Sequence, residues 1–325
     1  MLMVENIPLA HAWAASGVLN FHGKGYPYHW IPPWCFADWF GSVFVTKTVT
    51  VDNVVGRMPL EKDGCTPQEF FPECISANFW TGNVVNAVSL SNFGVDFYLK
   101  HAGWHTRTEP FIISFMALGN DSSDAFNQAS RFVVAISRWM YLCRAPFAIQ
   151  VNLSCPNVAH GAGKTAKEAF IEAWTLLTIL QDIGVPLIPK FSALTPPGFV
   201  SQISRHPGVC AVCVSNTIKS RDLSDEQRLQ IFGRTTSPLE HMDGGGWSGT
   251  NAFTFTRNWF EQARKTEVIR VPVLGGCGIV SWKQAKELLD LGASGIELGS
   301  IGITHPFRVQ SVIKKINAYA AQKEV

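Results

Sequence analysis

The sequence predicts an α/β fold, a single (β/α)8 barrel of the TIM type. Two observations favour it: short apolar runs alternate with longer helix-patterned stretches along nearly the whole chain, and polar residues follow the ends of the apolar runs. In a barrel, the C-terminal ends of all the strands meet at one mouth, where such polar groups can act together. An open sheet would spread them along an edge. The barrel is therefore preferred over a doubly wound sheet.

Eight apolar runs predict the strands of this barrel. Each run is apolar enough to be covered on both faces, as the strands of parallel sheets are. The expected strands are residues 10–17, 43–48, 111–117, 147–153, 186–191, 209–215, 271–275 and 294–299. The polar residues in their C-terminal halves or just beyond are Lys47, Ser114, Asn152, Lys190, Asn216 and Ser300.

The stretches between the strands carry helical patterns. The clearest of them span residues 124–143, 164–182, 254–265 and 281–291. Ser281 is a suitable N-cap for the last of these helices, and Gly292 is a suitable residue for its end.

Two connections are unusual. Residues 20–34 are rich in Gly, Pro, Trp and Tyr, which predicts an ordered loop packed by aromatic side chains. Residues 218–250 form a long polar connection, and long connections after barrel strands usually shape the substrate mouth. No repeat, linker or low-complexity tract interrupts the chain. We therefore expect one domain, residues 1–325, with elaborated loops at the C-terminal mouth of the barrel.

Composition excludes several classes of protein. Hydrophobic residues make up 46% of the chain and charged residues 16%, which excludes a disordered protein. The 27 Lys and Arg against 25 Asp and Glu give a charge of +2, too balanced for a dedicated nucleic-acid binder. No segment offers roughly 18 or more uninterrupted apolar residues, and the N-terminus lacks a basic region before a long apolar stretch. We therefore expect no membrane partner and a cytoplasmic location.

The eight cysteines show no disulfide-scaffold rhythm. Cys210 and Cys213 form the one C-x-x-C motif, inside an apolar run where a buried strand is favoured over a redox pair. Without a second C-x-x-C motif, the chain cannot complete a four-cysteine zinc or iron–sulfur site. We expect no bound metal.

Two phosphate-loop motifs match only in part. Residues 161–165 imitate the end of a Walker A loop, but Val158 stands where its first glycine is required. Gly244, Gly246 and Gly249 have the spacing of a dinucleotide fingerprint, yet no expected strand precedes them. Neither match supports a nucleotide fold.

The strongest signal lies at the end of the fourth expected strand, in Val151-Asn-Leu-Ser-Cys-Pro-Asn157. Cys155 stands in a polar loop between Ser154 and Pro156, a position suited to chemistry rather than packing. Asn152 and Asn157 flank it, and a carboxamide offers both donors and acceptors. Such groups suit the imide edge of a pyrimidine-like ring.

The run from Asn152 to Asn157 resembles the catalytic loop of dihydroorotate dehydrogenases, specifically of the soluble class that uses a cysteine as base. Other segments resemble the same family in order along the chain, over roughly residues 9–305. These segments are Ala15-Ser16-Gly17, Thr46 to Thr50, Asn86 to Leu90 with Asn92 to Leu99, Pro186 to Phe191, Val214 to Thr217, the loop ending at Gly249, Gly275 to Ile279, and Leu298 to Ser300.

The resemblance implies an FMN-containing barrel that oxidises dihydroorotate to orotate in pyrimidine biosynthesis, with Cys155 as the general base and hydride transfer to flavin N5. The substrate contacts that it implies are Lys47, Asn86, Val88, Ser89, Leu90, Asn152, Asn157, Asn216 and Thr217. The FMN contacts that it implies are Ala15, Ser16, Gly17, Lys47, Thr48, Asn152, Lys190, Ser215, Gly249, Gly276, Cys277, Gly278, Gly299 and Ser300.

The residues support FMN independently of the resemblance. Glycine-rich turns follow the seventh and eighth expected strands, where barrels bind phosphate through backbone N–H groups. Reduced flavin carries negative charge at N1 and the C2 oxygen, which a lysine at a strand end can stabilise. Lys190 suits that role, and Lys47 follows a strand too apolar to be exposed.

Three alternatives stay open. Ser89 and Ser91 stand where the family has glycine and proline, so the substrate is dihydroorotate or another dihydropyrimidine-like cyclic imide. A flavin-binding barrel without turnover is disfavoured, because Cys155 and Lys190 are both present. The electron acceptor is fumarate, NAD through a partner subunit, or another molecule.

The low charged fraction and the 22 Phe, 11 Trp and 5 Tyr predict a homodimer.

Overall fold

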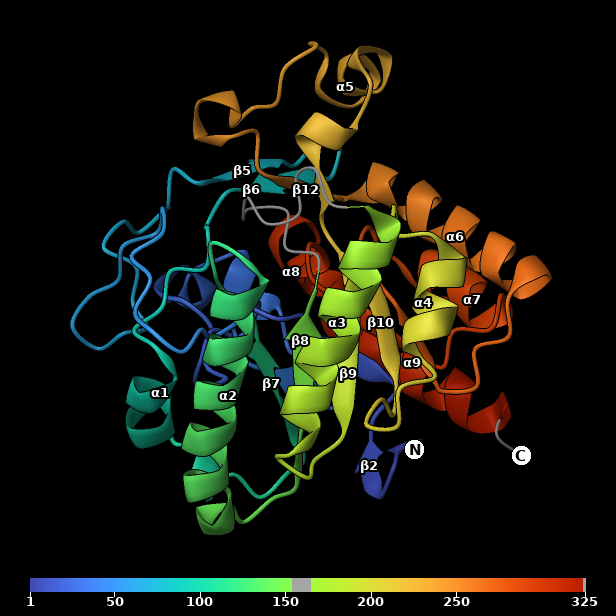
Figure 1. Cartoon of the computed structure of the whole chain (residues 1–325). Coiled ribbons are helices and arrows are strands. Elements are labelled where there is room, and N and C mark those ends of the chain that lie inside the picture. Colours follow the sequence, from blue (N-terminus) through green and yellow to red (C-terminus); the bar gives the residue numbers. More distant parts are fainter. Residues whose placement is uncertain (154–164, 324–325) are drawn as a thin grey trace.

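The computed structural model describes residues 1–153 and 165–323 (Figure 1). The described residues contain a closed barrel of eight parallel strands that follow one another around the barrel in chain order. The barrel closes where the last strand pairs with the first, Ile296 opposite Ala12. These strands are β3 (Ala12–Ala14), β4 (Val43–Val45), β7 (Phe111–Phe115), β8 (Phe147–Asn152), β9 (Leu187–Ser192), β10 (Val212–Asn216), β13 (Val273–Gly275) and β14 (Gly295–Leu298). Every predicted strand overlaps one of them, so the predicted (β/α)8 barrel is confirmed.

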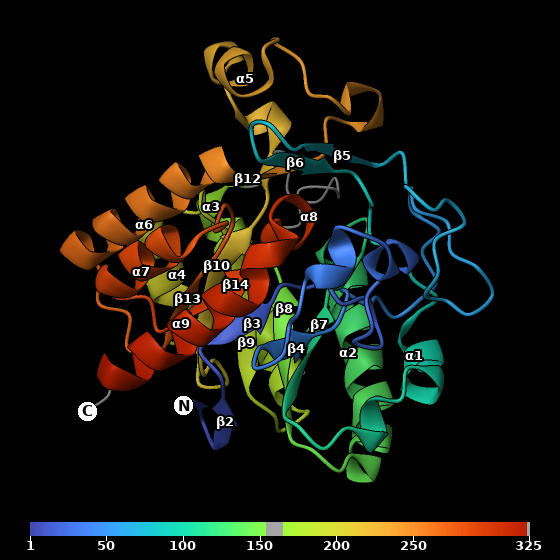
Figure 2. The same cartoon turned by 180° about the vertical axis from the view of Figure 1, so that it is seen from behind.

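Helices form the outer layer of the barrel (Figures 1 and 2). Each predicted helix is present, with different ends. The first one begins when the Asp121 side chain caps the amide of Asp124 at 2.9 Å, and it ends at Trp139, where a 3₁₀ turn takes over. The helices are α1 (Val95–His101), α2 (Ser122–Trp139), α3 (Ala166–Gln181), α4 (Pro197–Ile203), α6 (Phe253–Thr266), α7 (Trp282–Asp290), α8 (Ile301–Thr304) and α9 (Val309–Lys323).

The predicted caps of α7 are confirmed. The Ser281 hydroxyl accepts a hydrogen bond from the amide of Gln284, and Gly292 follows the helix with a φ of +106°. Glycine adopts that left-handed conformation without steric cost.

An N-terminal hairpin lies at the end of the barrel opposite the mouth (Figure 1). Its strands, β1 (Leu2–Val4) and β2 (Ile7–Leu9), pair antiparallel and bury their alternate residues against the inward-facing side chains of the barrel. Trp13 is fully buried in the same cluster. Within the described residues, the barrel interior is therefore a packed core rather than a pore.

A second sheet lies over the mouth (Figure 1). In the described chain it consists of β5 (Ile75–Asn78), β6 (Asn83–Asn86), β12 (Gly246–Gly249) and β11 (Ile218–Lys219), all antiparallel. The expected long polar connection 218–250 contributes two of these strands and the helix α5 (Asp225–Phe232), elements that the sequence pattern did not predict. Gly246 pairs with Asn86, which lies far away in the sequence, so no local sequence pattern predicts this pairing.

The aromatic loop 20–34 is ordered and packed. Phe21 stacks on Tyr98 with ring centroids 3.8 Å apart, and the Trp104 indole donates a hydrogen bond to the carbonyl of Phe21 at 2.6 Å. Tyr26 donates to the carbonyl of Gly17 at 2.8 Å, which fixes the loop against the end of the first barrel strand. Within the described residues, no helix is both long and apolar enough to cross a membrane.

Candidate active site

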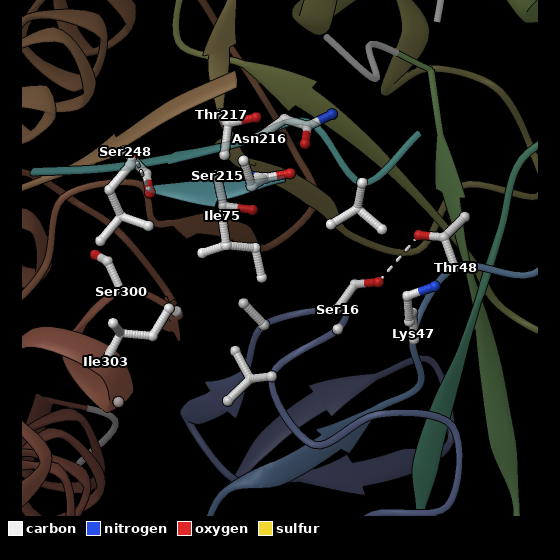
Figure 3. Close-up of a pocket in the computed structure, with 18 of the residues that line it drawn as sticks. Ser16, Lys47, Thr48, Ile75, Ser215, Asn216, Thr217, Ser248, Ser300 and Ile303 are labelled. Carbon is white, nitrogen blue, oxygen red and sulfur yellow. Dashed lines mark hydrogen bonds between the residues drawn. The ribbon is translucent and has the colours of Figure 1, made fainter. Parts of the chain in front are cut away.

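One cavity at the barrel mouth gathers most of the predicted site residues (Figure 3). Gly249 and Gly276 lie just behind its wall: a Cβ on Gly276 would meet the Ser215 side chain at 2.5 Å, and the Gly249 carbonyl faces Gly278. Cys155 and Asn157 lie outside the described residues. The predicted residues that line the cavity are Ala15, Ser16, Gly17, Lys47, Thr48, Asn86, Val88, Ser89, Leu90, Asn152, Lys190, Ser215, Asn216, Thr217, Cys277, Gly278, Gly299 and Ser300.

Lys190, on β9, is buried and pairs with a carboxylate. Its ammonium lies 3.0 Å from Glu297 of β14, whose side chain is fully buried. Burial alone lowers the pKa of Lys190, but the Glu297 carboxylate outweighs burial and holds that pKa above its ordinary value. In turn, the Lys190 ammonium keeps the pKa of Glu297 below its ordinary value, although burial alone would raise it. Both groups are therefore charged at neutral pH.

A bulge in β10 brings two consecutive side chains to the cavity. The register of β10 against β9 shifts between Val214 and Asn216, and both Ser215 and Asn216 line the cavity. The Ser215 hydroxyl donates a hydrogen bond to Glu297, and the Asn216 amide donates to the Asn152 side-chain carbonyl at 2.9 Å. Strand β10 thus links the Lys190–Glu297 ion pair to the asparagines predicted to face the substrate.

Lys47 follows β4 and is also buried, with 6% of its surface exposed. Its ammonium donates to the carbonyl of Ser91 and lies 4.8 Å from the centre of the Phe21 ring. Among the described residues it has no carboxylate partner, and the nearby Cys65 and Cys74 have pKa values raised by burial to about 12 and about 11, so they stay neutral. Burial lowers the pKa of Lys47 to about 7. This is an electrostatic environment that an anion would complete.

Hydroxyl groups hold the backbone beside Lys47. Ser16 donates to the carbonyl of Thr46 at 2.9 Å, and its hydroxyl lies 3.0 Å from that of Thr48. Figure 3 marks the contact between Ser16 and Thr48 with a dashed line. Thr48 in turn lies 2.9 Å from the Ser114 hydroxyl. This chain of hydroxyls joins three neighbouring strand ends and orients the wall from which Lys47 projects.

The segment from Asn86 to Ser91 approaches the cavity with a strained backbone. Ser89 and Leu90 have φ values of +56° and +61°, a left-handed conformation that costs non-glycine residues about 1 kcal/mol or more each. The glycine that the family resemblance leads us to expect at position 89 would adopt it freely. Strain of this kind is typical of functional segments, and here it brings the backbone beside Lys47, which binds the carbonyl of Ser91.

The glycine turns fit a phosphate group. Among the described residues, no acceptor takes a hydrogen bond from the N–H groups of Cys277, Gly278 or Gly299, all of which line the cavity. Gly278 has a φ of +99°, and a Cβ there would stand 2.2 Å from the Phe253 amide nitrogen, so a side chain is excluded. Burial raises the pKa of the Cys277 thiol to about 12, so this cysteine stays neutral. Unpaired amides around a glycine turn are a suitable anion site.

Taken with Lys190, these turns are compatible with FMN. The turns would hold the phosphate, and Lys190 would face the end of the flavin ring where negative charge gathers on reduction. The amides of these turns and the Lys190 ammonium are therefore donor groups that fit FMN.

Sequence interpretation missed several residues of the cavity wall. Tyr26, Tyr28 and His29 enter it from the aromatic loop, where the pattern indicated packing but no site. Burial lowers the pKa of His29 to about 4, so it is neutral at physiological pH. Glu297 was missed as well, although a lone carboxylate inside an apolar strand is a signal that a partner is required. The remaining residues missed are Val18, Met58, Pro72, Ile75, Val84, Ser248, Gly302 and Ile303.

Known proteins resemble the chain over most of its length. The catalytic subunit of dihydroorotate dehydrogenase B (NAD(+)) from Caldicellulosiruptor bescii is 26% identical over 294 residues, 87% of this chain and 83% of the relative. The protein of the same name from Bacteroides thetaiotaomicron is 27% identical over 240 residues, 73% of this chain and 72% of the relative. A crystal structure of DHODH from Eimeria tenella, in complex with ferulenol, matches 99% of this chain and 85% of its own with a TM-score of 0.65 at 15% identity, which supports the fold.

A family model described as dihydroorotate dehydrogenase matches residues 66–319. This range includes six of the eight segments that accompany the Asn152–Asn157 run in the resemblance, all of those from Asn86 onward, and most of the barrel. The chain therefore belongs to the dihydroorotate dehydrogenase family and is an FMN-dependent oxidoreductase that acts on CH–CH bonds.

Proposed function

We propose that this chain oxidises dihydroorotate to orotate, with FMN as the hydride acceptor. The observation that carries the proposal is Lys47, a buried cation without a carboxylate partner among the described residues, in the cavity that also holds Lys190 and the glycine turns. A small anionic substrate would supply the missing counter-charge. Dihydroorotate differs from neutral dihydropyrimidines by a carboxylate, so Lys47 supports the acid as the substrate.

The other cavity residues have complementary roles in this proposal. Asn86, Asn152, Asn216 and Thr217 would hydrogen-bond the ring amide and carbonyl groups, for which carboxamides are suited. The backbone of Val88, Ser89 and Leu90 would enclose the substrate carboxylate beside Lys47. The FMN contacts are proposed as the sequence predicts them, with Ala15, Ser16, Gly17 and Thr48 on one side of the cavity and the glycine turns supplying phosphate contacts.

Cys155 is proposed as the general base, on the grounds of its sequence context. Oxidation removes a proton from C5 of dihydroorotate and a hydride from C6, so that two hydrogens and two electrons leave and a C5–C6 double bond forms. The thiolate of Cys155 would take the proton. FMN, when bound, would supply the hydride acceptor. A free cysteine has a pKa of about 8.5, so flavin reduction should accelerate as pH rises towards that value.

Anaerobic titration of the FMN-containing protein with dihydroorotate tests the proposed function. We expect the flavin absorbance to bleach with dihydroorotate and to persist with dihydrouracil, which lacks the carboxylate that Lys47 would bind. Bleaching by dihydrouracil alone would favour another cyclic imide as substrate. The Ser89 side chain, which lies in the cavity wall, is the feature that supports this alternative. A protein that takes up no FMN would overturn both.

Replacing the proposed base separates its role from that of the cofactor site. Cys155→Ala should keep FMN bound and slow flavin reduction by about 10²–10⁴-fold, the usual contribution of a general base. Cys155→Ser should retain some activity only at higher pH. The matched control is Cys210→Ala, because Cys210 lies near Glu5 of the N-terminal hairpin, away from the mouth. A wild-type rate in Cys155→Ala would exclude Cys155 as the base.

We also propose that the chain works in a larger assembly. The relatives from Caldicellulosiruptor bescii and Bacteroides thetaiotaomicron are named as catalytic subunits with NAD(+), which supports an electron-transfer partner subunit. Exposed aromatic side chains near the mouth support a homodimer, among them Trp30, Phe79, Trp80 and Phe307. Light scattering should give twice the 35.8 kDa of one chain. A monomer at micromolar concentration would contradict the homodimer.

A further inference from the structure

Glu297 is a buried carboxylate that the proposed reaction does not use. It lies in β14 between Ile296 and Leu298, with 1% of its surface exposed, and it lines the cavity. Isolated carboxylates are rarely buried, because the loss of hydration strongly disfavours their charged form. The position of Glu297 therefore requires partners that compensate the charge.

Four groups surround the carboxylate of Glu297. The Lys190 ammonium lies at 3.0 Å, the Gln150 side-chain amide donates at 3.0 Å, and the Ser215 hydroxyl donates a further hydrogen bond. The Cys213 thiol lies at 3.3 Å. With these contacts the carboxylate is fully solvated by the protein, and it fixes the direction in which Lys190 extends.

The Lys190–Glu297 pair is neutral as a unit. Lys190 thus presents N–H donors to the cavity without a net positive charge, unlike a lysine that stands alone. The distinction matters for a flavin, because reduction adds two electrons and, at N5, one proton. The ring then carries one negative charge over N1 and the C2 oxygen. A net positive charge nearby would favour this reduced form, whereas a neutral pair favours it less.

We propose that Glu297 is a positioning residue that sets the reduction potential of bound FMN through Lys190. It holds the ammonium at the cavity wall and cancels its charge, so that the reduced flavin is a stronger reductant than it would be beside an uncompensated lysine. This inference rests on the FMN site of the proposed function. It does not depend on which substrate reduces the flavin.

The test measures the midpoint potential of the FMN-containing protein by equilibration with reference dyes during reduction by dithionite. Glu297→Gln keeps the size of the side chain and removes its charge. We expect its potential to rise by at least about 30 mV, which corresponds to a tenfold change in the equilibrium constant of a two-electron couple. Glu297→Leu, with an apolar group of similar volume, should shift the potential in the same direction.

Sulfite provides a second readout of the same charge. Its lone pair forms a bond from sulfur to flavin N5, and the displaced electron pair leaves a negative charge at N1, as in reduction. Glu297→Gln should therefore form the adduct with a dissociation constant at least tenfold lower than that of the wild-type protein. Loss of packing alone would not produce this increase in affinity.

Cys213→Ala is the matched control, because it removes a neutral contact to the Glu297 carboxylate and leaves the charges in place. Its potential and sulfite affinity should stay close to wild type. Unchanged values in both Glu297 variants would overturn the inference, and so would loss of folding or of FMN in both, which would give Glu297 a merely structural role. A wild-type protein that binds FMN but ignores dihydroorotate would instead contradict the proposed function and leave this test intact.

Discussion

Two buried lysines line the same cavity in opposite electrostatic surroundings. Lys190 has the Glu297 carboxylate at 3.0 Å, whereas Lys47 has a backbone carbonyl and an aromatic ring but no carboxylate among the described residues. The pKa of Lys190 is raised by its partner, and that of Lys47 is lowered to about 7 by burial. The protein supplies the counter-charge of one lysine and leaves that of the other to a ligand.

The backbone differs between the two lysines in the same sense. Lys190 lies within a regular strand of the barrel, paired on both sides. Lys47 binds the carbonyl of Ser91, directly after two left-handed non-glycine residues. The region around Lys47 therefore holds both an unpaired charge and backbone strain. Such costs are typical of a site whose ligand contacts matter more than the stability of the empty fold.

Replacing each lysine by methionine should have effects of opposite sign on the stability of the FMN-free protein. Lys190→Met leaves the Glu297 charge buried without its partner, and we expect a loss of about 3–5 kcal/mol in the free energy of unfolding. Lys47→Met removes a charge whose burial is costly. At pH 6, below its lowered pKa, Lys47 is protonated in the folded and unfolded states alike, so this variant should gain roughly 2–4 kcal/mol.

Chemical denaturation at two pH values checks this contrast. The gain from Lys47→Met should shrink as pH rises from about 7 towards the ordinary lysine value near 10.5, because the folded state then holds a neutral amine. Lys190→Met combined with Glu297→Leu should recover much of the stability that Lys190→Met loses. A loss of stability in both single methionine variants at pH 6 would contradict the comparison.

The same Lys47→Met change should weaken the binding of orotate, the proposed product. Losing one partner of a buried charge pair usually costs about 2–4 kcal/mol, so the dissociation constant should rise by roughly 30- to 1000-fold. Titration calorimetry on the FMN-containing protein measures it. Lys24→Met, which removes an exposed charge from the aromatic loop, should leave the affinity unchanged. Equal affinities for wild type and Lys47→Met would mean that Lys47 is not the carboxylate contact.

The affinity for orotate should also decrease as the pH rises. Below pH 7 the ammonium of Lys47 is already formed and binds the anion directly. Above its pKa of about 7 the neutral amine must first take up a proton, so the dissociation constant should rise by up to about tenfold for each pH unit. Measurements between pH 6 and 9 would show this slope, and Lys47→Met should lack it. If the affinity of the wild-type protein stayed the same across this range, orotate binding would not be coupled to proton uptake.

The fold could be predicted from sequence because each barrel strand is a separate apolar run, and most of these runs have a polar residue in the C-terminal half or just beyond. The same pattern indicated Lys47, Asn152, Lys190 and Asn216 as residues of one mouth, which the cavity brings together. The sheet over the mouth could not be predicted, because its strands are short and pair across distant parts of the chain.

Glu297 shows the limit of such patterns for the site. Its strand is apolar on both sides, so the local pattern signals that the carboxylate requires a partner but not which residue supplies it. That partner, Lys190, lies in another strand more than a hundred positions earlier, and only the closed barrel brings the two together. The strand pattern identified Lys190 as a site residue but not the neutral pair that it forms.

The smallest effect that we expect concerns the backbone beside Lys47. Ser89→Gly removes the Cβ from a residue with a φ of +56°, which should raise the free energy of unfolding by about 0.5 kcal/mol. The gain is modest because glycine also adds flexibility to the unfolded chain and because the Ser89 hydroxyl loses its 3.3 Å hydrogen bond to the carbonyl of Ala87. Ser89→Ala is the control, since it loses the same hydrogen bond but keeps the Cβ. We expect the glycine variant to be the more stable of the two in denaturant titrations. If the alanine variant were the more stable, the left-handed backbone at Ser89 would carry no strain, and the cost at the Lys47 side of the cavity would be one of charge alone.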